Sequence, residues 1–170
     1  MAITTYCGRA RRALLHKLNS TYWLAVGRTT AWTDEQAPPT PAPGVIDIEE
    51  AIVFVPAEMV RLAKFVQSLE DVVVKGNRYK FVEDVDAIEQ QARFIYIKGR
   101  FDPSTDQPYG TFRQLAIFTG VAPKTAYQGR PWLAPAHVQS RGVLEYIENK
   151  PPTAMSLERE EVVQAIIEFR

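Results

Sequence analysis

Short runs in which apolar and polar residues alternate occupy most of the chain, and this period of two is typical of β-strands that bury one face. In the run 92–101, for example, Ile95 and Ile97 share one side of the strand. Gly, Pro, Asp and Ser separate the runs and favour turns. We therefore predict strands at 22–26, 51–55, 60–66, 72–74, 78–82, 92–101, 112–120, 142–149 and 160–169.

Two segments have features of a helix instead. Within residues 1–20, Tyr6, Ala10 and Leu14 recur at four-residue steps, which places them on one helix face. We predict an N-terminal helix in this range. A helix also competes with the strand between residues 57 and 66, because Pro56 and Glu58 suit a helix start. The loose alternation there favours a strand.

Proline is concentrated in one stretch that follows the first predicted strand. Prolines occupy positions 38, 39, 41 and 43, and an acidic patch precedes them. Proline has no backbone donor, so the stretch cannot join the interior of a sheet. We predict a proline-rich surface arm at residues 33–44 with an extended, polyproline-like path. A second irregular segment, at 121–139, is predicted to be a long surface loop.

These elements predict a mainly β fold of the α+β type. We expect an antiparallel β-sandwich with an N-terminal helix and a proline-rich surface arm. A chain of 170 residues is the right length for a single domain, so we expect residues 1–170 to form one β-rich domain.

Charge and composition narrow the functional classes. Twenty basic residues balance twenty acidic ones, so no strong field attracts nucleic acid or an anionic membrane. Cys7 is the one cysteine, which rules out an intramolecular disulfide. No secretory signal is recognisable and no apolar run is long enough to cross a bilayer. We expect synthesis in the cytoplasm of a host cell, and no membrane partner.

No catalytic, cofactor or metal pattern stands out. A glycine-rich phosphate loop is missing, and His16 and His137 stand in unrelated contexts. The segment 102–106 resembles the start of a calcium loop, but Arg113 takes the position that needs a bidentate glutamate. We expect a protein that is not an enzyme and that binds neither a cofactor nor a metal.

Two charged motifs have simpler interpretations than chemistry. The run Arg9–Arg12 contains three arginines, which are too few in a neutral chain to favour nucleic acid. A solvated helix face, or one that meets an acidic neighbour, is the better interpretation. The pair Glu49–Glu50 is interpreted as charges that discourage strand pairing rather than as glycosidase carboxylates.

Three stretches together resemble a known family. They are WLAVGRTTAWTDEQAPPTP at 23–41, FRQLAIFTG at 112–120 and GVLEYIENKPPTAMSLEREEVVQAIIEF at 142–169. In this order they are similar to the baseplate wedge proteins of contractile-tailed bacteriophages. The likeness is greatest to the dimeric β-sandwich wedge subunit of T-even phages, in a shortened form. The stretches cover roughly a third of the chain.

The resemblance implies a structural virion protein of the phage tail baseplate, with other baseplate or tail proteins as partners and a homodimer or symmetric assembly as its state. We expect Gly27 to allow a sharp exit from its strand, and Arg28 and Arg113 to pair with carboxylates. The residues that match the family pattern are Trp23, Gly27, Arg28, Trp32, Pro38, Pro39, Arg113, Gln114, Glu148, Asn149, Pro151 and Pro152.

Further expectations concern the local roles of these residues. Pro151 and Pro152 are expected to fix a turn before the last strand, and Asn149 to bond nearby backbone. The proline arm and the loop 127–135 are expected to supply much of the interface. Two alternatives stay open: a neck or head-to-tail connector protein, and a module that binds host glycans through Trp32 and Trp132.

Overall fold

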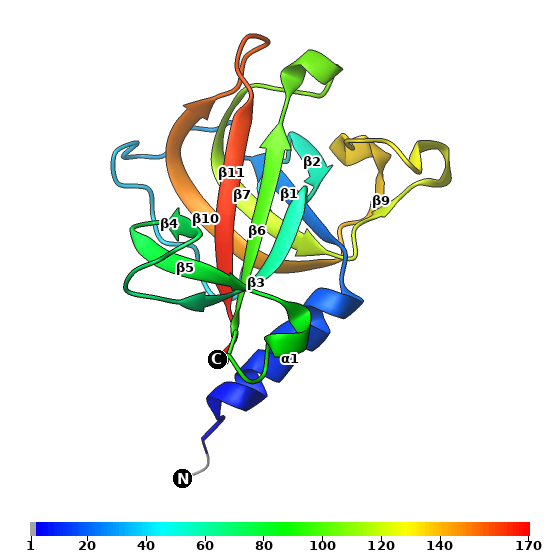
Figure 1. The fold of residues 1–170 in the computed structure, drawn as a ribbon. Coiled ribbons are helices and arrows are strands. Elements are labelled where there is room, and N and C mark those ends of the chain that lie inside the picture. The colour runs from blue at the N-terminus through cyan, green and yellow to red at the C-terminus, as the bar shows by residue number, and fades with distance from the viewer. Residues whose placement is uncertain (1–2) are drawn as a thin grey trace. The chain divides into compact units, whose positions relative to one another are not determined.

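The computed structural model describes residues 3–170, and these fall into two compact units. The first, here called the helix unit, joins the described N-terminal residues up to Ser20 to residues 58–98 and 164–170. The second, the arm unit, joins residues 21–57 to residues 99–163. Both units are therefore discontinuous in sequence. Figure 1 shows the elements of each.

The helix unit begins with α1 (Tyr6–Asn19), as the apolar spacing predicts. The Thr5 side chain accepts a hydrogen bond from the Gly8 amide at 3.2 Å and caps the first turn. Ala10 and Ala13 are fully buried, and β3 lies against the helix. Lys17 pairs with Asp84 of the 3-10 turn η1 (Asp84–Asp86) at 2.6 Å. Small residues on the inner face of α1 allow this close packing.

A five-stranded sheet lies mostly in the helix unit, with the order β11-β6-β3-β5-β4. Strand β3 pairs antiparallel with both β5 and β6, so residues 59–65 form a strand and the competing helix is absent. Tyr79, Phe94 and Tyr96 form an aromatic cluster on one face. The strands are β3 (Met59–Phe65), β4 (Val72–Val74), β5 (Asn77–Val82), β6 (Phe94–Phe101) and β11 (Glu161–Glu168).

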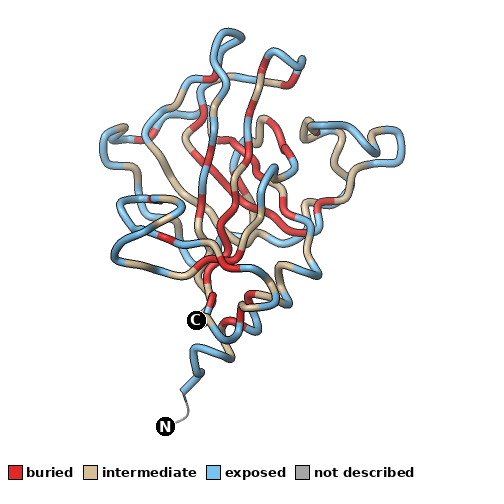
Figure 2. The backbone as a smooth tube through the Cα atoms, in the orientation of Figure 1, coloured by how far each residue is buried: buried red, intermediate tan, exposed pale blue. Residues whose placement is uncertain are grey.

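The arm unit contains an antiparallel four-stranded sheet with the order β10-β7-β1-β2. In its centre, Ala25 of β1 lies opposite Ala116 of β7 and Phe54 of β2. Phe54 of β2 and Phe118 of β7 pack with Leu133 in the core of this unit. Buried stretches follow the strands in Figure 2, and the connecting loops are largely exposed. The strands are β1 (Tyr22–Gly27), β2 (Val53–Pro56), β7 (Thr111–Thr119) and β10 (Val143–Ala154).

Residues 121–139 of the arm unit contain short regular elements. Leu133 in this segment is fully buried, and its amide and carbonyl both bond Phe54 at 2.8 Å. The segment therefore covers the outer edge of β2. Its elements are β8 (Ala122–Pro123), η3 (Thr125–Tyr127), η4 (Pro135–His137) and β9 (Val138–Ser140), while η2 (Pro103–Thr105) lies in the loop after β6.

The predicted fold class is confirmed: the protein is mostly β, with antiparallel sheets and one N-terminal helix. The expected turn at Pro151 and Pro152 is wrong, because both prolines lie inside β10. The pairing of β10 with β7 shifts register between Asn149 and Thr153. Since β10 is an edge strand, the missing proline donors cost it no ladder partner on its open side.

Candidate functional site

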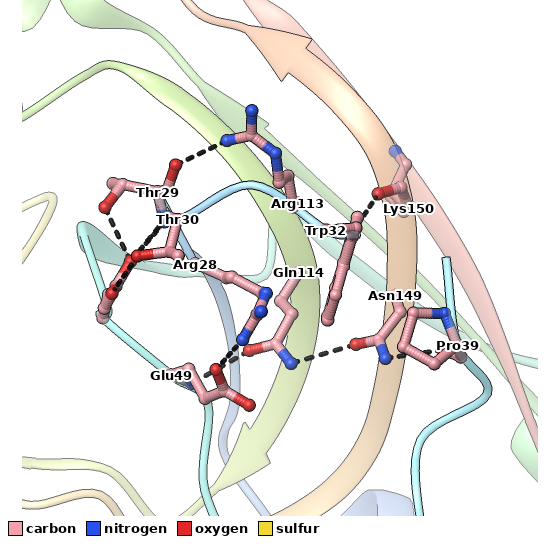
Figure 3. Close-up of polar contacts among 11 residues, drawn as sticks. Arg28, Thr29, Thr30, Trp32, Pro39, Glu49, Arg113, Gln114, Asn149 and Lys150 are labelled. Carbon is pink, nitrogen blue, oxygen red and sulfur yellow. Dashed lines mark hydrogen bonds and ion pairs between the residues drawn. The ribbon is translucent and has the colours of Figure 1, made fainter. Parts of the chain in front are cut away.

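The arm unit contains a chain of hydrogen bonds between side-chain amides that reaches the proline arm. Gln114, in β7, is only 4% exposed. Its Oε1 accepts from the Glu49 amide at 2.9 Å, and its Nε2 donates to Asn149 Oδ1 at 2.9 Å. Asn149 Nδ2 then donates to the Pro39 carbonyl at 2.7 Å (Figure 3). The sheet is thereby linked to the proline arm and to the segment before β2.

Trp32 provides a second attachment for the segment leading into the proline arm. Its Nε1 donates to the Lys150 carbonyl at 3.0 Å, which gives a partner to a main-chain group of the edge strand β10 (Figure 3). The Arg28 guanidinium lies 3.7 Å from the centre of the Trp32 ring and also pairs with the Glu49 carboxylate. Trp32 is only 9% exposed. Its ring is therefore not available for stacking on a glycan, and the expectation that Trp32 serves in this way is wrong.

Arg113 holds the segment from the other side. Its Nε donates to both oxygens of Glu35, at 2.8 and 3.0 Å, and its Nη1 donates to the Thr29 carbonyl at 2.6 Å. The pKa of Glu35 is lowered, chiefly because Arg113 donates to its carboxylate. The forked guanidinium suits this geometry. Arg28 and Arg113 do pair with carboxylates within the chain.

Glu50 is held by four donors from the turn after β1. The amides of Thr29 and Thr30 approach its Oε2 at 2.7 and 2.8 Å. The two hydroxyls bond its Oε2 and Oε1 at 2.6 Å. These bonds lower the pKa of Glu50 to about 2, and the bonds from the Thr29 and Thr30 side chains have the largest effect. Glu50 therefore organises a turn, a role that the interpretation of the Glu49–Glu50 pair as charges against strand pairing did not include.

Glu50 gives the protein a testable dependence on acid. Its pKa is depressed from 4.5 to about 2, so its contribution to stability is present above pH 4.5 and is lost as the pH falls toward 2. We expect the loss of stability between these two pH values to be smaller in Glu50→Gln than in the wild type. Urea unfolding at a series of pH values measures it. Glu89→Gln, at an exposed position, should retain the wild-type slope, and an unchanged slope in Glu50→Gln would contradict this role.

Gly27 has a different role from the expected one. A Cβ at this position would lie 2.4 Å from the Glu49 carbonyl oxygen, so glycine allows the two backbones to approach. The Arg28 amide donates to that carbonyl at 2.6 Å. The left-handed conformation belongs to Arg28, with φ of 55°. The sharp exit from the strand therefore depends on Arg28, and Gly27 is required for the close approach.

The structure gathers seven of the twelve sequence-predicted residues around this network and places the others apart. Trp23 packs on the core of the arm unit, and Glu148 accepts a hydrogen bond from Tyr146 at 2.8 Å. Pro38 is half-buried, whereas Pro151 and Pro152 are exposed in β10. The seven are Gly27, Arg28, Trp32, Pro39, Arg113, Gln114 and Asn149.

Sequence reasoning missed the acidic and hydroxyl partners of these residues. Glu35 and Glu49 pair with the two arginines, and Thr29 and Thr30 bond Glu50. The sequence contains only a weak signal for these contacts. Two adjacent hydroxyl residues, Thr29 and Thr30, follow Arg28, and two adjacent acids, Glu49 and Glu50, lie some twenty positions later. Such a pairing becomes meaningful only when β1 and β2 are known to be neighbours.

A shallow groove lies between the proline arm and the edge strand β10. Its volume is about 310 Å³. Residues 40–43 and Val45 line one side, and residues 144–147 of β10 line the other. The Lys150 carbonyl that Trp32 bonds lies outside residues 144–147, so the groove follows a different part of the same strand. The proline arm and β10 thus form one continuous surface of the arm unit.

The chemistry of the site is that of a structural network. Among residues 3–170, no three or more His, Cys, Asp or Glu side chains gather in a way that could hold a metal ion. Asp102 instead accepts from the Ser104 amide at 3.0 Å and caps η2. Within the same residues, no helix has both the length and the apolar character needed to cross a membrane. Most donors and acceptors of the network bond one another, although the Nε of Arg28 is buried without a hydrogen-bond partner.

Comparison with known proteins decides the family. A family model described as "Baseplate wedge 3 tail fiber network component" matches residues 1–169. The chain belongs to this family. It is also 32% identical over 156 residues to "Virion protein 3" of Enterococcus phage phiEF24C, a match that covers 88% of the chain and 85% of that protein.

Membership of the baseplate wedge 3 family confirms the broad functional expectation. The protein is a structural component of a phage virion and belongs to the baseplate. The family match therefore favours the baseplate over the neck connector that the sequence left open. The network around Gln114 and Trp32 therefore lies in a structural protein of the baseplate.

Proposed function

We propose that the protein is a wedge component of a contractile tail baseplate that acts through protein–protein contacts alone, without a catalytic step. One observation carries the proposal: the proline arm is held to the sheet of the arm unit by Asn149 and Trp32 while much of its own surface stays exposed. A segment held in this way is a surface prepared for a partner. Similarity to T-even wedge subunits adds a homodimer or a symmetric assembly to the proposal.

The energetic argument concerns entropy. An unheld loop would lose conformational freedom on binding, at about 0.5–1.5 kcal/mol for each side chain that becomes ordered. Here Pro39 is fixed by the bond to its carbonyl, and proline has little freedom to lose. The arm can therefore meet a partner at low entropic cost.

Apolar side chains extend the proline arm on its exposed side. Ile46 is 85% exposed and Val45 37% exposed, directly after the arm, and Pro43 is exposed as well. These groups adjoin the groove along β10, which Val45 helps to line. A stable interface covers about 800 Å² on each partner, so the arm, the groove and β10 would be covered together.

Ile46→Asp tests this surface without touching the network. We expect the variant to fold normally and to enter assembled particles poorly, because a charge would be buried in the interface. Immunoblots of purified particles, with thermal unfolding of the isolated protein as the check on folding, measure the effect. Leu69→Asp is a matched control, since Leu69 is 82% exposed and lies in the helix unit.

The outcome of this comparison is decisive for the arm. Loss of incorporation in Ile46→Asp but not in Leu69→Asp supports the proposed surface. Equal incorporation of both variants would contradict it. A deletion of residues 34–43 is a less sharp test, because it also removes Glu35, the partner of Arg113.

A further inference from the structure

Four arginines gather in the helix unit where α1 meets the end of the chain's last strand. Arg93 and Arg9 both approach the ring of Tyr6, with their guanidinium carbons 4.4 and 5.5 Å from its centre. Arg12 donates to the main-chain oxygen of Arg170, and the Phe169 amide donates to the Arg93 carbonyl at 3.0 Å. We call Arg9, Arg12, Arg93 and Arg170 the arginine cluster.

The Glu168 carboxylate contacts two members of the arginine cluster. It lies 3.0 Å from the Nε of Arg170 and 3.4 Å from the Nε of Arg93. Helix α1 contains no Asp or Glu in its range, and the Nε of Arg9 is buried without a hydrogen-bond partner. Two of the four guanidinium groups contact this carboxylate, so the arginine cluster keeps an excess of positive charge. Exposed guanidinium groups such as that of Arg12 favour an added carboxylate acceptor.

The excess is a property of the whole helix unit and not of the chain. Residues 1–20, 58–98 and 164–170 together carry a net charge of +4, and the rest of the chain carries −4. The neutrality of the full sequence therefore hides a basic unit. Two members of the arginine cluster lie in α1. No residue of α1 takes part in the network around Gln114.

A hollow with apolar residues adjoins the arginine cluster. Its volume is about 360 Å³, and residues 3–6 line it together with Arg9. Ile3 is 81% exposed and Tyr6 51% exposed. An occupant that meets both the hollow and the cluster would present carboxylates beside an apolar side chain, a combination typical of a protein segment. A nucleic-acid backbone would leave the apolar side chains without a contact.

We propose that the arginine cluster and its hollow bind an acidic, apolar-containing segment of another virion protein. This inference rests on the proposed assembly function and adds a second surface with partner chemistry of its own. Forked guanidinium groups pair with carboxylates in two parallel bonds, and Arg12 and Arg170 are exposed to such an acceptor. The occupant supplies the negative charge that α1 lacks.

Binding by the purified full-length protein tests the chemistry first. The probe is a fluorescent ten-residue peptide of alternating glutamate and leucine. Binding of a 20-base-pair DNA duplex is measured for comparison. We expect Arg12→Glu to bind the peptide roughly tenfold more weakly than the wild type, and Lys80→Glu to bind as the wild type does. Arg12 and Lys80 are both exposed, so each substitution changes the charge equally. Thermal unfolding of both variants checks for any effect of losing the bond from Arg12 to Arg170.

Two results of this titration would overturn the proposal. One is equal peptide binding by the wild type and Arg12→Glu. The other is tighter binding to the duplex than to the peptide, which would make the cluster a nucleic-acid site. Peptide binding does not depend on where the protein sits in the virion. It can therefore fail or succeed independently of the Ile46→Asp result.

Phage carrying Arg12→Glu then identify the occupant. We expect poor incorporation, restored by suppressors that replace an acidic residue of another virion protein with a neutral or basic one. Suppressors confined to acidic residues of this same chain would overturn the proposal, because they would indicate contact between two copies. Normal incorporation without suppressors would overturn it as well.

Discussion

Gly27→Ala is expected to reduce the free energy of unfolding by about 3 kcal/mol, because a well-packed site would receive an atom for which there is no room. The added Cβ would lie 2.4 Å from the Glu49 carbonyl oxygen and 3.1 Å from the Ala51 Cα. Both are main-chain atoms, which cannot rotate away as a side chain can. The hydrogen bond from Arg28 to that carbonyl would be strained together with the turn held by Glu50.

Thermal and urea unfolding measure this loss, and for a chain of this size it corresponds to a decrease in Tm of roughly 6–12 °C. Gly44→Ala is the matched control. A Cβ at Gly44 meets nothing within 4 Å, so the variant should be neutral or slightly more stable. A Gly27→Ala protein as stable as Gly44→Ala would show that the approach of residues 27 and 49 is not required.

Gln114→Leu should cost about 2–3 kcal/mol, since a part-buried donor and a part-buried acceptor would each lose a partner. The Glu49 amide would lose its acceptor, and Asn149 Oδ1 would lose its donor. Asn149 would then be free to rotate, and its bond to the Pro39 carbonyl would weaken. We therefore expect the proline arm to become mobile in this variant. Urea unfolding and proteolysis within residues 33–44 measure the two effects.

The chain contains a natural control for the loss of a buried glutamine. Gln107 is 3% exposed, close to the 4% of Gln114, but its Nε2 has no hydrogen-bond partner. Replacing Gln107 with Leu removes an unsatisfied polar group, so we expect it to be much less destabilising than Gln114→Leu. Similar losses in the two variants would mean that burial, and not the network, explains the effect of Gln114→Leu.

The strands and the helix could be predicted because their signals are local. Alternation at Ile95 and Ile97, and the four-residue steps from Tyr6, depend on the segment alone. The position of Pro151 and Pro152 inside a strand could not be predicted. A strand tolerates proline at the edge of a sheet, and whether β10 is an edge strand depends on its neighbours. Sequence patterns do not contain the order of strands in a sheet.

Sequence reasoning named some residues of the network, but neither their partners nor the geometry. Resemblance to a family singled out Gln114, Asn149 and Trp32, which the fold brings together. Their partners are main-chain carbonyls of Pro39 and Lys150, and such acceptors have no sequence signature. Polar networks of this kind depend on which segments are adjacent, and that is decided by tertiary structure.

Assembly through two surfaces would suit a baseplate protein. The exposed side of the proline arm is apolar and held in place, whereas the arginine cluster is basic and adjoins a hollow. Surfaces of such different chemistry would select different partners, because apolar burial favours affinity and charge pairing favours specificity. Each can be tested without disturbing the other, since the substitutions lie in different units.

The most direct test of the assembly function is photo-crosslinking from position 46 in intact particles. A photoreactive phenylalanine analogue replaces Ile46, which is exposed and outside the network. Mass spectrometry then identifies the adduct. Our proposal predicts a crosslink to a baseplate protein, at a yield well above that from the same analogue at Leu69. If particles contain the protein but position 46 forms no crosslink, the proposal that the proline arm and the residues directly after it form an assembly surface is contradicted.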